Sequence, residues 1–321
     1  MTTDRSKVFS RRHLSRFLAT LFYVIVAYVL VQYFKDIDWG KLSATDINWR
    51  VLGLALFSDL CIRFLHPGIW ILILKEFGEN IKDYWGLNLA YAKAWLGRYV
   101  PGKVAWIGGK IYFGAQQGVD VKVLTLGSFL ESLIQLIAHF SLALFVMSFY
   151  TKGVLDQRIR MFALVSLAIL LIFTYPPFFN RVTSLAYTMF KGKEIGARYA
   201  LRFRTMYKIF SLLVLIGILN GIPAVLVCRS VVPSFDLTSN FFYVAGAGCF
   251  AGCMGILAVF APSGLGVREG IFTIFLTVLF PREAILVILV VMRLSATIAD
   301  LGFFLVSKGI LHVSAHPRIE Q

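Results

Sequence analysis

Residues 98–103 read RYVPGK, and residues 261–269 read APSGLGVRE. Both stretches place Pro and Gly beside fixed charges, inside sequence that is otherwise apolar enough to lie in lipid. A helix loses backbone hydrogen bonds at Pro, and hydrocarbon contains no water to replace them. Such breaks are tolerated where protein or a wet cavity satisfies the backbone. A matched pair of them is typical of the substrate site of a transporter.

The chain around these breaks has the composition of a polytopic membrane protein. Of its 321 residues, 58% are hydrophobic, above the roughly 45–50% apolar content of soluble domains. A bilayer core of about 30 Å requires about 20 helical residues for one crossing. Residues 17–34 follow a basic segment and are expected to form a retained signal-anchor helix. The expected helices are 17–34, 51–74, 84–98, 103–117, 122–149, 161–176, 208–229, 241–260, 265–280 and 284–307.

The order of these helices predicts an all-α bundle with an inverted repeat. Residues 17–149 and 161–307 each read helix, helix, broken hairpin, long helix, and the two sets start on opposite sides of the membrane. Segments 84–98 and 103–117 are too short to span alone, which predicts a re-entrant hairpin with Pro101 and Gly102 at its tip. The second broken segment is either a hairpin or two crossings.

The distribution of basic residues predicts the topology. The net charge is +15, and with the N-terminus in the cytoplasm the inside segments carry 17 Lys and Arg against 7 outside. Residues 177–208 are the most basic inside segment. The predicted division is a cytoplasmic N-terminus at 1–16, one transmembrane domain at 17–307 and a cytoplasmic tail at 308–321. The expected location is the inner (cytoplasmic) membrane.

Several charged residues around the breaks are candidates for binding a substrate. Charges within a bilayer are costly unless they are paired or hydrated, so they mark functional sites. The bases outnumber the acids in this set, and Arg binds phosphate through two parallel hydrogen bonds, which favours an anionic guest. Helix starts after Pro101 and Pro262 would add backbone N–H groups. The set is Arg98, Lys103, Glu131, Arg268, Glu269 and Arg293.

An alternative is that these charges pair internally. Arg98 or Arg293 could pair with Glu131, and Arg268 with Asp300, in which case a pair that opens for substrate would act as a gate. We expect Lys93, Lys110 and Arg229 to extend along the helices towards the membrane surface. The P-loop motif, the HExxH motif and the GxSxG motif are absent from the sequence, so no cofactor, metal ion or enzyme activity is expected.

The residues at the breaks resemble a known family. The RYVPG segment at 98–102, Glu131 in a long helix, the GLGVRE segment at 264–269 and Arg293 are similar to the transmembrane, flippase-like region of lysylphosphatidylglycerol synthase. The resemblance spans residues 17–307. It implies a stand-alone inner-membrane member that handles a lipid with a phosphate headgroup. Ser132 departs from the pattern, because many members have Arg there. The functional residues that the resemblance implies are Arg98, Pro101, Gly102, Glu131, Gly264, Gly266, Arg268, Glu269 and Arg293.

Three functions stay open at this point. The leading one is a flippase or transporter for an anionic-headgroup lipid, either a phospholipid or a polyprenyl-phosphate-linked lipid. The second is a non-catalytic partner subunit of an enzyme that modifies phospholipids or glycan lipids, with the basic segment 177–208 docking that enzyme. The third is a membrane transferase with Glu131 or Glu269 as base. The short tail after residue 307 leads us to expect no synthase domain. No nucleic-acid partner is expected.

Overall fold

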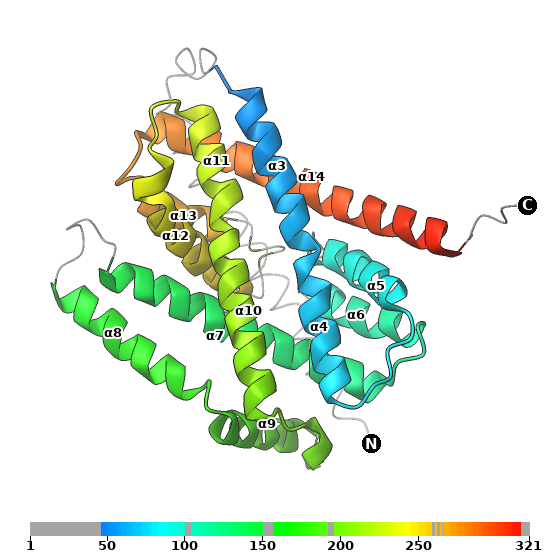
Figure 1. Ribbon diagram of the computed structural model, residues 1–321. Helices are drawn as coiled ribbons and strands as arrows, with labels where there is room; N and C mark the ends of the chain where they lie inside the picture. Colours follow the sequence, from blue (N-terminus) through cyan, green and yellow to red (C-terminus); the bar gives the residue numbers. More distant parts are fainter. Residues whose placement is uncertain are drawn as a thin grey trace, which may run out of the picture.

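The computed structural model describes residues 46–99, 104–149, 157–191, 196–258, 261, 264 and 266–315. Within these ranges all regular structure is helical, which confirms the prediction of an all-α membrane bundle (Figure 1). The helix expected at 17–34 and the break residues Pro101, Gly102 and Lys103 lie outside the described residues. The elements are α3 (Trp49–Arg63), α4 (Leu65–Glu76), α5 (Tyr84–Leu96), η1 (Gly97–Tyr99), α6 (Val104–Ala115), α7 (Val121–Phe149), α8 (Gln157–Ile172), α9 (Pro176–Lys191), η2 (Ala197–Tyr199), α10 (Phe203–Leu219), α11 (Gly221–Val231), α12 (Leu237–Leu257), α13 (Val267–Leu276) and α14 (Arg282–Ala315).

Five helical segments of the described chain are long and apolar enough to cross a bilayer. The number becomes six if the bent pair of α8 and α9 is taken as one span. Helices α5, α6 and α13 have 13, 12 and 10 residues, fewer than the roughly 20 that one crossing needs. The re-entrant interpretation of the first hairpin stays a prediction. The five segments are Trp49–Glu76, Val121–Phe149, Phe203–Val231, Leu237–Leu257 and Arg282–Val313.

Two of the spans are interrupted at the same distance before a proline. Helix α3 ends at Arg63, four residues before Pro67, and α10 ends at Leu219, four residues before Pro223. Proline has no N–H, so the carbonyl four residues earlier loses its helical partner and the ring crowds it. The sequence therefore determines both interruptions locally, and each span continues as a second helix, α4 or α11.

Twice along the chain, a kinked span is followed by a helical hairpin and then by a long helix. The first set is α3–α4, α5–α6 and α7, and the second is α10–α11, α12–α13 and α14. The two kinked spans run antiparallel, and the backbone N–H of Asn48 donates to the Ser230 carbonyl at 2.9 Å (Figure 1). This order agrees with an inverted repeat, which stays a prediction because the first expected helix is not described.

The apolar side chains form two large cores. One contains buried residues of α4, α5, α7 and α10, including Trp70 and Tyr91. The other joins the first half of α3 to α11, α12, α13 and the start of α14, and includes Phe272 and Ile288. Each core buries the apolar faces of several helices, which is the arrangement that stabilises helix contacts. The space between the two cores holds the polar side chains described below.

Some predicted boundaries were wrong. The helix expected at 161–176 runs from Gln157 to Ile172, and the helix expected at 208–229 begins earlier, at Phe203. The helix expected to start at 241 begins at Leu237, because Asp236 caps it through the amides of Thr238 and Ser239. Helix α9 was not predicted, because residues 177–208 were treated as one basic segment between spans.

Candidate functional site

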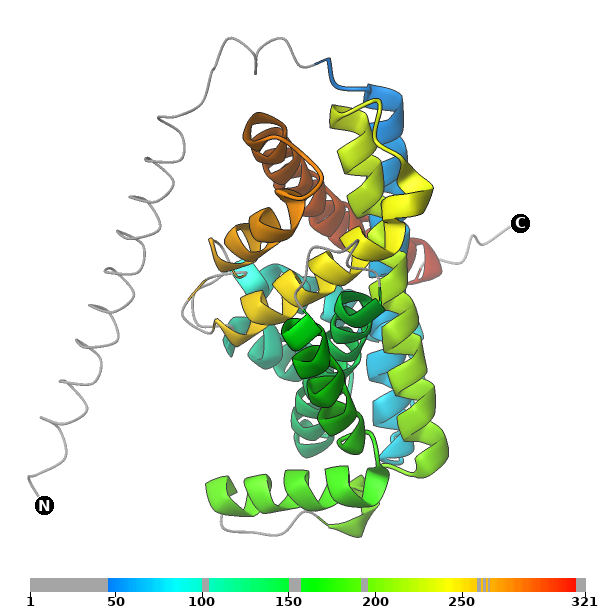
Figure 2. The same ribbon diagram turned by 90° about the vertical axis from the view of Figure 1, so that its left-hand side faces the viewer.

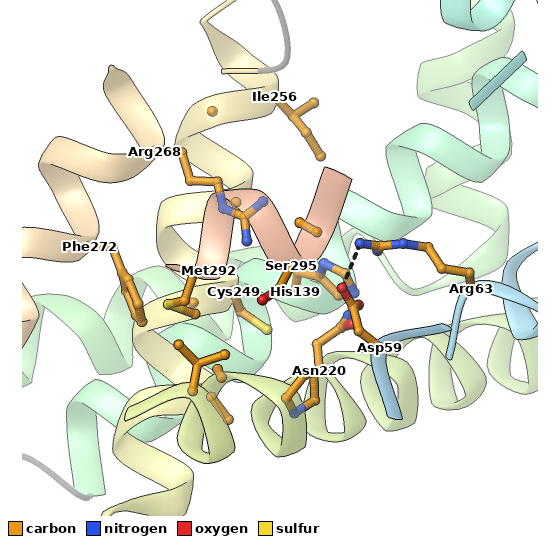
Figure 3. Close-up of a pocket in the computed structure, with 18 of the residues that line it drawn as sticks. Asp59, Arg63, His139, Asn220, Cys249, Ile256, Arg268, Phe272, Met292 and Ser295 are labelled. Atoms are coloured by element: carbon orange, nitrogen blue, oxygen red, sulfur yellow. Dashed lines mark hydrogen bonds and ion pairs between the residues drawn. The ribbon is translucent and has the colours of Figure 1, made fainter. Parts of the chain in front are cut away.

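A cavity of about 230 Å³ lies between the two cores. Side chains of both kinked spans and of both hairpins line it, so every part of the repeated pattern contributes (Figure 3). Its charged lining residues are Asp59, Arg63, Arg98 and Arg268, and its uncharged polar lining includes Gln135, His139, Asn220 and Ser295. A mainly apolar cavity with a few converging polar side chains is the usual form of a small-molecule site.

Asp300 of α14 lies behind one wall of this cavity and joins it to the first hairpin. Its carboxylate accepts from Arg98 of η1, and its Oδ1 lies 2.9 Å from Nε of Arg63. Trp95 Nε1 donates to Oδ1 at 2.8 Å, and the Tyr99 hydroxyl donates to Oδ2 at 2.5 Å. Asp300 is completely buried, so both oxygen atoms of its carboxylate interact with these side chains and not with bulk water.

Arg63 and Arg98 share more than the Asp300 carboxylate. Arg63 also pairs with Asp59, one turn earlier on the same helix, at 3.0 Å. Both guanidinium groups stack over the Trp95 ring, with their carbons 5.5 and 5.0 Å from its centroid. These cation–π contacts fix the two arginines against one wall. The predicted site included Arg98 but not Arg63 or Asp59, and Asp300 pairs with Arg63 and Arg98 instead of with Arg268 as the alternative had it.

Arg268 enters the cavity differently. Its guanidinium points inward from α13, from the side opposite Arg63 (Figure 3). Within the described ranges no carboxylate lies within 4 Å of its nitrogen atoms. The three arginines of the cavity therefore face two carboxylates, Asp59 and Asp300, which both lie near Arg63. Arg268 therefore forms no salt bridge with a described carboxylate, and the charges of Glu269 and Asp59 act on it from a greater distance.

Further polar atoms of the lining have no hydrogen-bond partner among the described residues. They are His66 Nδ1, Arg98 Nε, Trp106 Nε1 and His139 Nε2. Buried polar atoms are almost always hydrogen-bonded in proteins, and those that lack a protein partner mark a place for water or ligand. Three of the four are side chains of the first hairpin or of the kinked span that precedes it. The lining is therefore suited to a polar guest.

Glu269 and Arg293 lie beside the cavity, at the contact of α13 with α14. Their closest atoms, Glu269 Oε1 and Arg293 Nη1, are 3.5 Å apart, and each side chain is about one quarter exposed. The other carboxylate oxygen of Glu269 accepts from the backbone N–H of Gly266 at 2.8 Å, which caps α13. The predicted pairing of Arg293 with Glu131 does not occur.

Glu131 lies away from the cavity lining. Its Oε2 is 2.6 Å from Lys110 Nζ, its Oε1 accepts from the Tyr91 hydroxyl at 2.8 Å, and it is 1% exposed. Lys110 is fully buried, so the expectation that it reaches the membrane surface was wrong. A carboxylate enclosed by these two partners joins α6 to α5 and α7. The structure places Glu131 in a packing role between helices, apart from the cavity.

Gly264 and Gly266 allow the backbone conformation of the second break. Both have positive φ, +69° and +84°, which side chains of L-residues rarely adopt. A Cβ atom on Gly264 would lie 2.8 Å from the Cα atom of Gly255 in α12, so only glycine permits this close approach. The two glycines thus bring the start of α13, and with it Arg268, against α12.

Residues 16–302 match the family model of the lysylphosphatidylglycerol synthase TM region. The chain belongs to this family. A search of curated proteins gave no match. As a member of the lysylphosphatidylglycerol synthase TM region family, with five or six apolar helices, the protein is a multi-pass membrane protein. Among the described residues, no three His, Cys, Asp or Glu side chains are grouped as metal ligands.

Proposed function

We propose that this protein moves a lipid with a phosphate-bearing headgroup across the membrane, and that the headgroup passes through the cavity between the two cores. The observation that carries the proposal is Arg268, whose guanidinium points into the cavity without a described carboxylate partner. An unpaired cation costs at least about 2.5–3.5 kcal/mol in a bilayer centre. An anion in the cavity would offset that cost, and a phosphate oxygen pair matches the guanidinium.

The size of the cavity fits a headgroup better than a whole lipid. Drug-sized ligands occupy sites of about 300–1,000 Å³, whereas this cavity has about 230 Å³. Two fatty chains would have to stay in the bilayer. A smaller cavity of about 20 Å³ lies between α13 and α14 and shares Arg268, Phe272 and Met292 with the main one. We propose that the lipid lies across the contact between α13 and α14, with its headgroup in the cavity and its chains in the bilayer.

The transferase alternative loses support from the two acids that it needs. Glu131 is enclosed by Lys110 and Tyr91, and Glu269 caps α13 and contacts Arg293. Neither carboxylate faces the cavity as an unengaged base. The partner-subunit alternative does not explain why a cation without a salt bridge faces an internal cavity. Both alternatives predict that purified protein alone moves no lipid.

The experiment is lipid translocation in proteoliposomes of purified protein. Fluorescent phosphatidylglycerol, a fluorescent polyprenyl phosphate and an uncharged diacylglycerol analogue would be compared for the wild type, Arg268→Ala and Arg268→Lys. We expect movement of the anionic lipids by the wild type, loss of about 30-fold or more in Arg268→Ala, and a smaller loss in Arg268→Lys, because Lys keeps the charge without the paired donors.

The matched control is Arg50→Ala, which removes an exposed arginine at the start of α3 that does not line the cavity. It should translocate as the wild type does. Equal rates for the wild type and Arg268→Ala would refute the proposed role of the cavity. No movement of any lipid by well-folded wild-type protein would refute the transport function.

A further inference from the structure

Helix α9 lies across one end of the bundle. It follows α8 after a bend of 79° at a short break, and it is roughly perpendicular to the α10–α11 span (Figure 2). Its 16 residues correspond to about 24 Å of helix, at a rise of 1.5 Å per residue. Helices α8 and α9 are apolar enough for the membrane only as a bent pair, and α10 after them belongs to the apolar span Phe203–Val231. Helix α9 therefore lies where the chain turns between two membrane segments.

The surface of α9 is divided into three sectors. Phe179, Thr183 and Tyr187, four residues apart, pack against the bundle, and the first two are buried. A polar sector, which includes Asn180, Ser184 and Thr188, lies beyond them in the helical period. The third sector is an apolar stripe made of Phe178, Val182, Leu185 and Met189, which are 38%, 37%, 58% and 86% exposed.

Helix α9 is bonded to the start of α10, and the short helix η2 that follows α9 is bonded to the end of α4. Asn180 donates to the carbonyl of Leu201 at 2.9 Å and accepts from its N–H at 3.0 Å, which ties α9 to the start of α10. Arg198 of η2 donates to the carbonyl of Phe77 at 2.5 Å, and Tyr199 packs edge-on against the Phe77 ring. The two Asn180–Leu201 bonds hold α9 beside the start of α10, at an angle to α8.

The surroundings of α9 are strongly basic. The described residues between Pro176 and Lys208 include five exposed basic side chains and no acidic one. One of them, Arg202, lies 3.7 Å from Glu76, yet its side chain is 88% exposed, so most of its surface faces outward. The five are Arg181, Arg198, Arg202, Arg204 and Lys208.

We propose that α9 lies in the headgroup layer of an anionic membrane, parallel to its plane. Its apolar stripe would reach the upper acyl region, and the five basic residues would bind lipid phosphates. A helix with an apolar stripe, a polar sector and basic neighbours has the properties of an interfacial helix. Basic clusters next to membrane spans attract anionic lipids in the same way. The proposal is independent of the transport function proposed above.

The test uses fluorescence quenching in proteoliposomes of the full chain. Cys61 is the exposed member of the four cysteines, and the other three are buried, so Cys61→Ser gives a background for labelling. In it, Met189→Cys places a bimane label on the apolar stripe, and Ser184→Cys places a matched label in the polar sector of the same helix. Phosphatidylcholine brominated near the headgroup end of its chains quenches from the membrane, and iodide quenches from water.

We expect the label at 189 to be quenched at least twofold more by the brominated lipid than the label at 184, and iodide to show the reverse order. A label at 189 that iodide quenches fully and brominated lipid does not would overturn the proposal, since the stripe would then face water. Strong quenching of both labels by lipids brominated deep in the chains would also overturn it, because α9 would then span.

A second arm tests the charge. Brominated phosphatidylglycerol should quench the label at 189 more than brominated phosphatidylcholine at the same mole fraction. The difference should shrink in 0.5 M salt, which screens exposed charges, and in the Arg202→Gln/Arg204→Gln variant. Equal quenching by the two lipids in low salt would contradict the binding of anionic headgroups.

Discussion

Lys110 and Glu131 form an ion pair that is sealed from solvent, with Nζ and Oε2 2.6 Å apart and both side chains at most 1% exposed. The ammonium also lies 5.0 Å from the centre of the Tyr91 ring and 4.6 Å from that of Trp106. The pair joins the second arm of the first hairpin to the long helix α7. It therefore sets the position of the hairpin whose other arm leads to Arg98.

This pair should show strong coupling between its members. Removing one partner leaves an uncompensated buried charge, so Lys110→Met should lower the free energy of unfolding by about 3–5 kcal/mol. The double variant Lys110→Met/Glu131→Gln should lose less than Lys110→Met alone, because no buried charge is left. Denaturation of the wild type, Lys110→Met, Glu131→Gln and the double variant in detergent measures the coupling. Additive losses in the double variant would show that the two residues act separately.

Asp300 should matter more for stability than Asp59, although both contact Arg63. Asp300 accepts from Arg98, Trp95 and Tyr99 as well, whereas Asp59 pairs within its own helix. We expect Asp300→Asn to lower the free energy of unfolding by about 3–5 kcal/mol and Asp59→Asn by clearly less. Thermal unfolding of both variants in one detergent makes the comparison. A larger loss in Asp59→Asn would be inconsistent with the network.

Gly264 should be intolerant of any side chain. Alanine there would place a Cβ atom 2.8 Å from the Cα atom of Gly255 and would also occupy a left-handed conformation at φ +69°. The conformation alone costs roughly 1–2 kcal/mol, and the clash adds to it. Gly270→Ala is the matched control, because open space surrounds that position in α13. Its unfolding temperature should equal or exceed that of the wild type, while Gly264→Ala unfolds earlier.

Asp236 should give the start of α12 a pH dependence. Hydrogen bonds from Ser239 and Thr238 lower the pKa of the Asp236 carboxyl to about 2. Because this pKa is below the ordinary value of 3.8, the carboxylate stabilises the helix start above about pH 4. That contribution is lost as the pH falls towards 2. Amide hydrogen exchange of the first turn of α12, corrected for intrinsic rates, should rise over this range in the wild type.

The control for this prediction is Asp236→Asn, whose amide oxygen can still cap the helix but does not titrate. Its exchange in the first turn should not change between pH 4 and pH 2. A pH dependence that persists in Asp236→Asn would assign the effect to another group.

Local sequence determined much of the fold. Apolar runs of sufficient length predicted the spans, and the prolines at 67 and 223 interrupt helices through the loss of one hydrogen bond. Glycines at 264 and 266 marked the turn before α13. Helix α9 was missed because residues 177–208 were treated as one basic segment, although apolar residues three or four apart within it indicate an amphipathic helix.

The pairing of the charges could not be predicted from the sequence. Arg98 and Asp300 are 202 residues apart, and which base meets which acid depends on how helices rotate and pack. The prediction included Glu131 and Arg268 in one site, whereas the structure encloses the first and leaves the second facing the cavity. The sequence does hold a signal for the observed pairs, because Asp59, Arg63, Lys110 and Asp300 are charged residues within apolar runs.

The pairing of Asp59 with Arg63 also matters during synthesis of the chain. Asp300 is made 237 residues after Arg63, a delay of about 10–50 s at ordinary elongation rates. During that interval α3 enters the membrane without its distant counter-ion. The carboxylate one turn away neutralises Arg63 from the moment that this helix forms. A charge that the finished bundle shares with Asp300 is thus already compensated in the nascent protein, which lowers the cost of membrane insertion for the first described span.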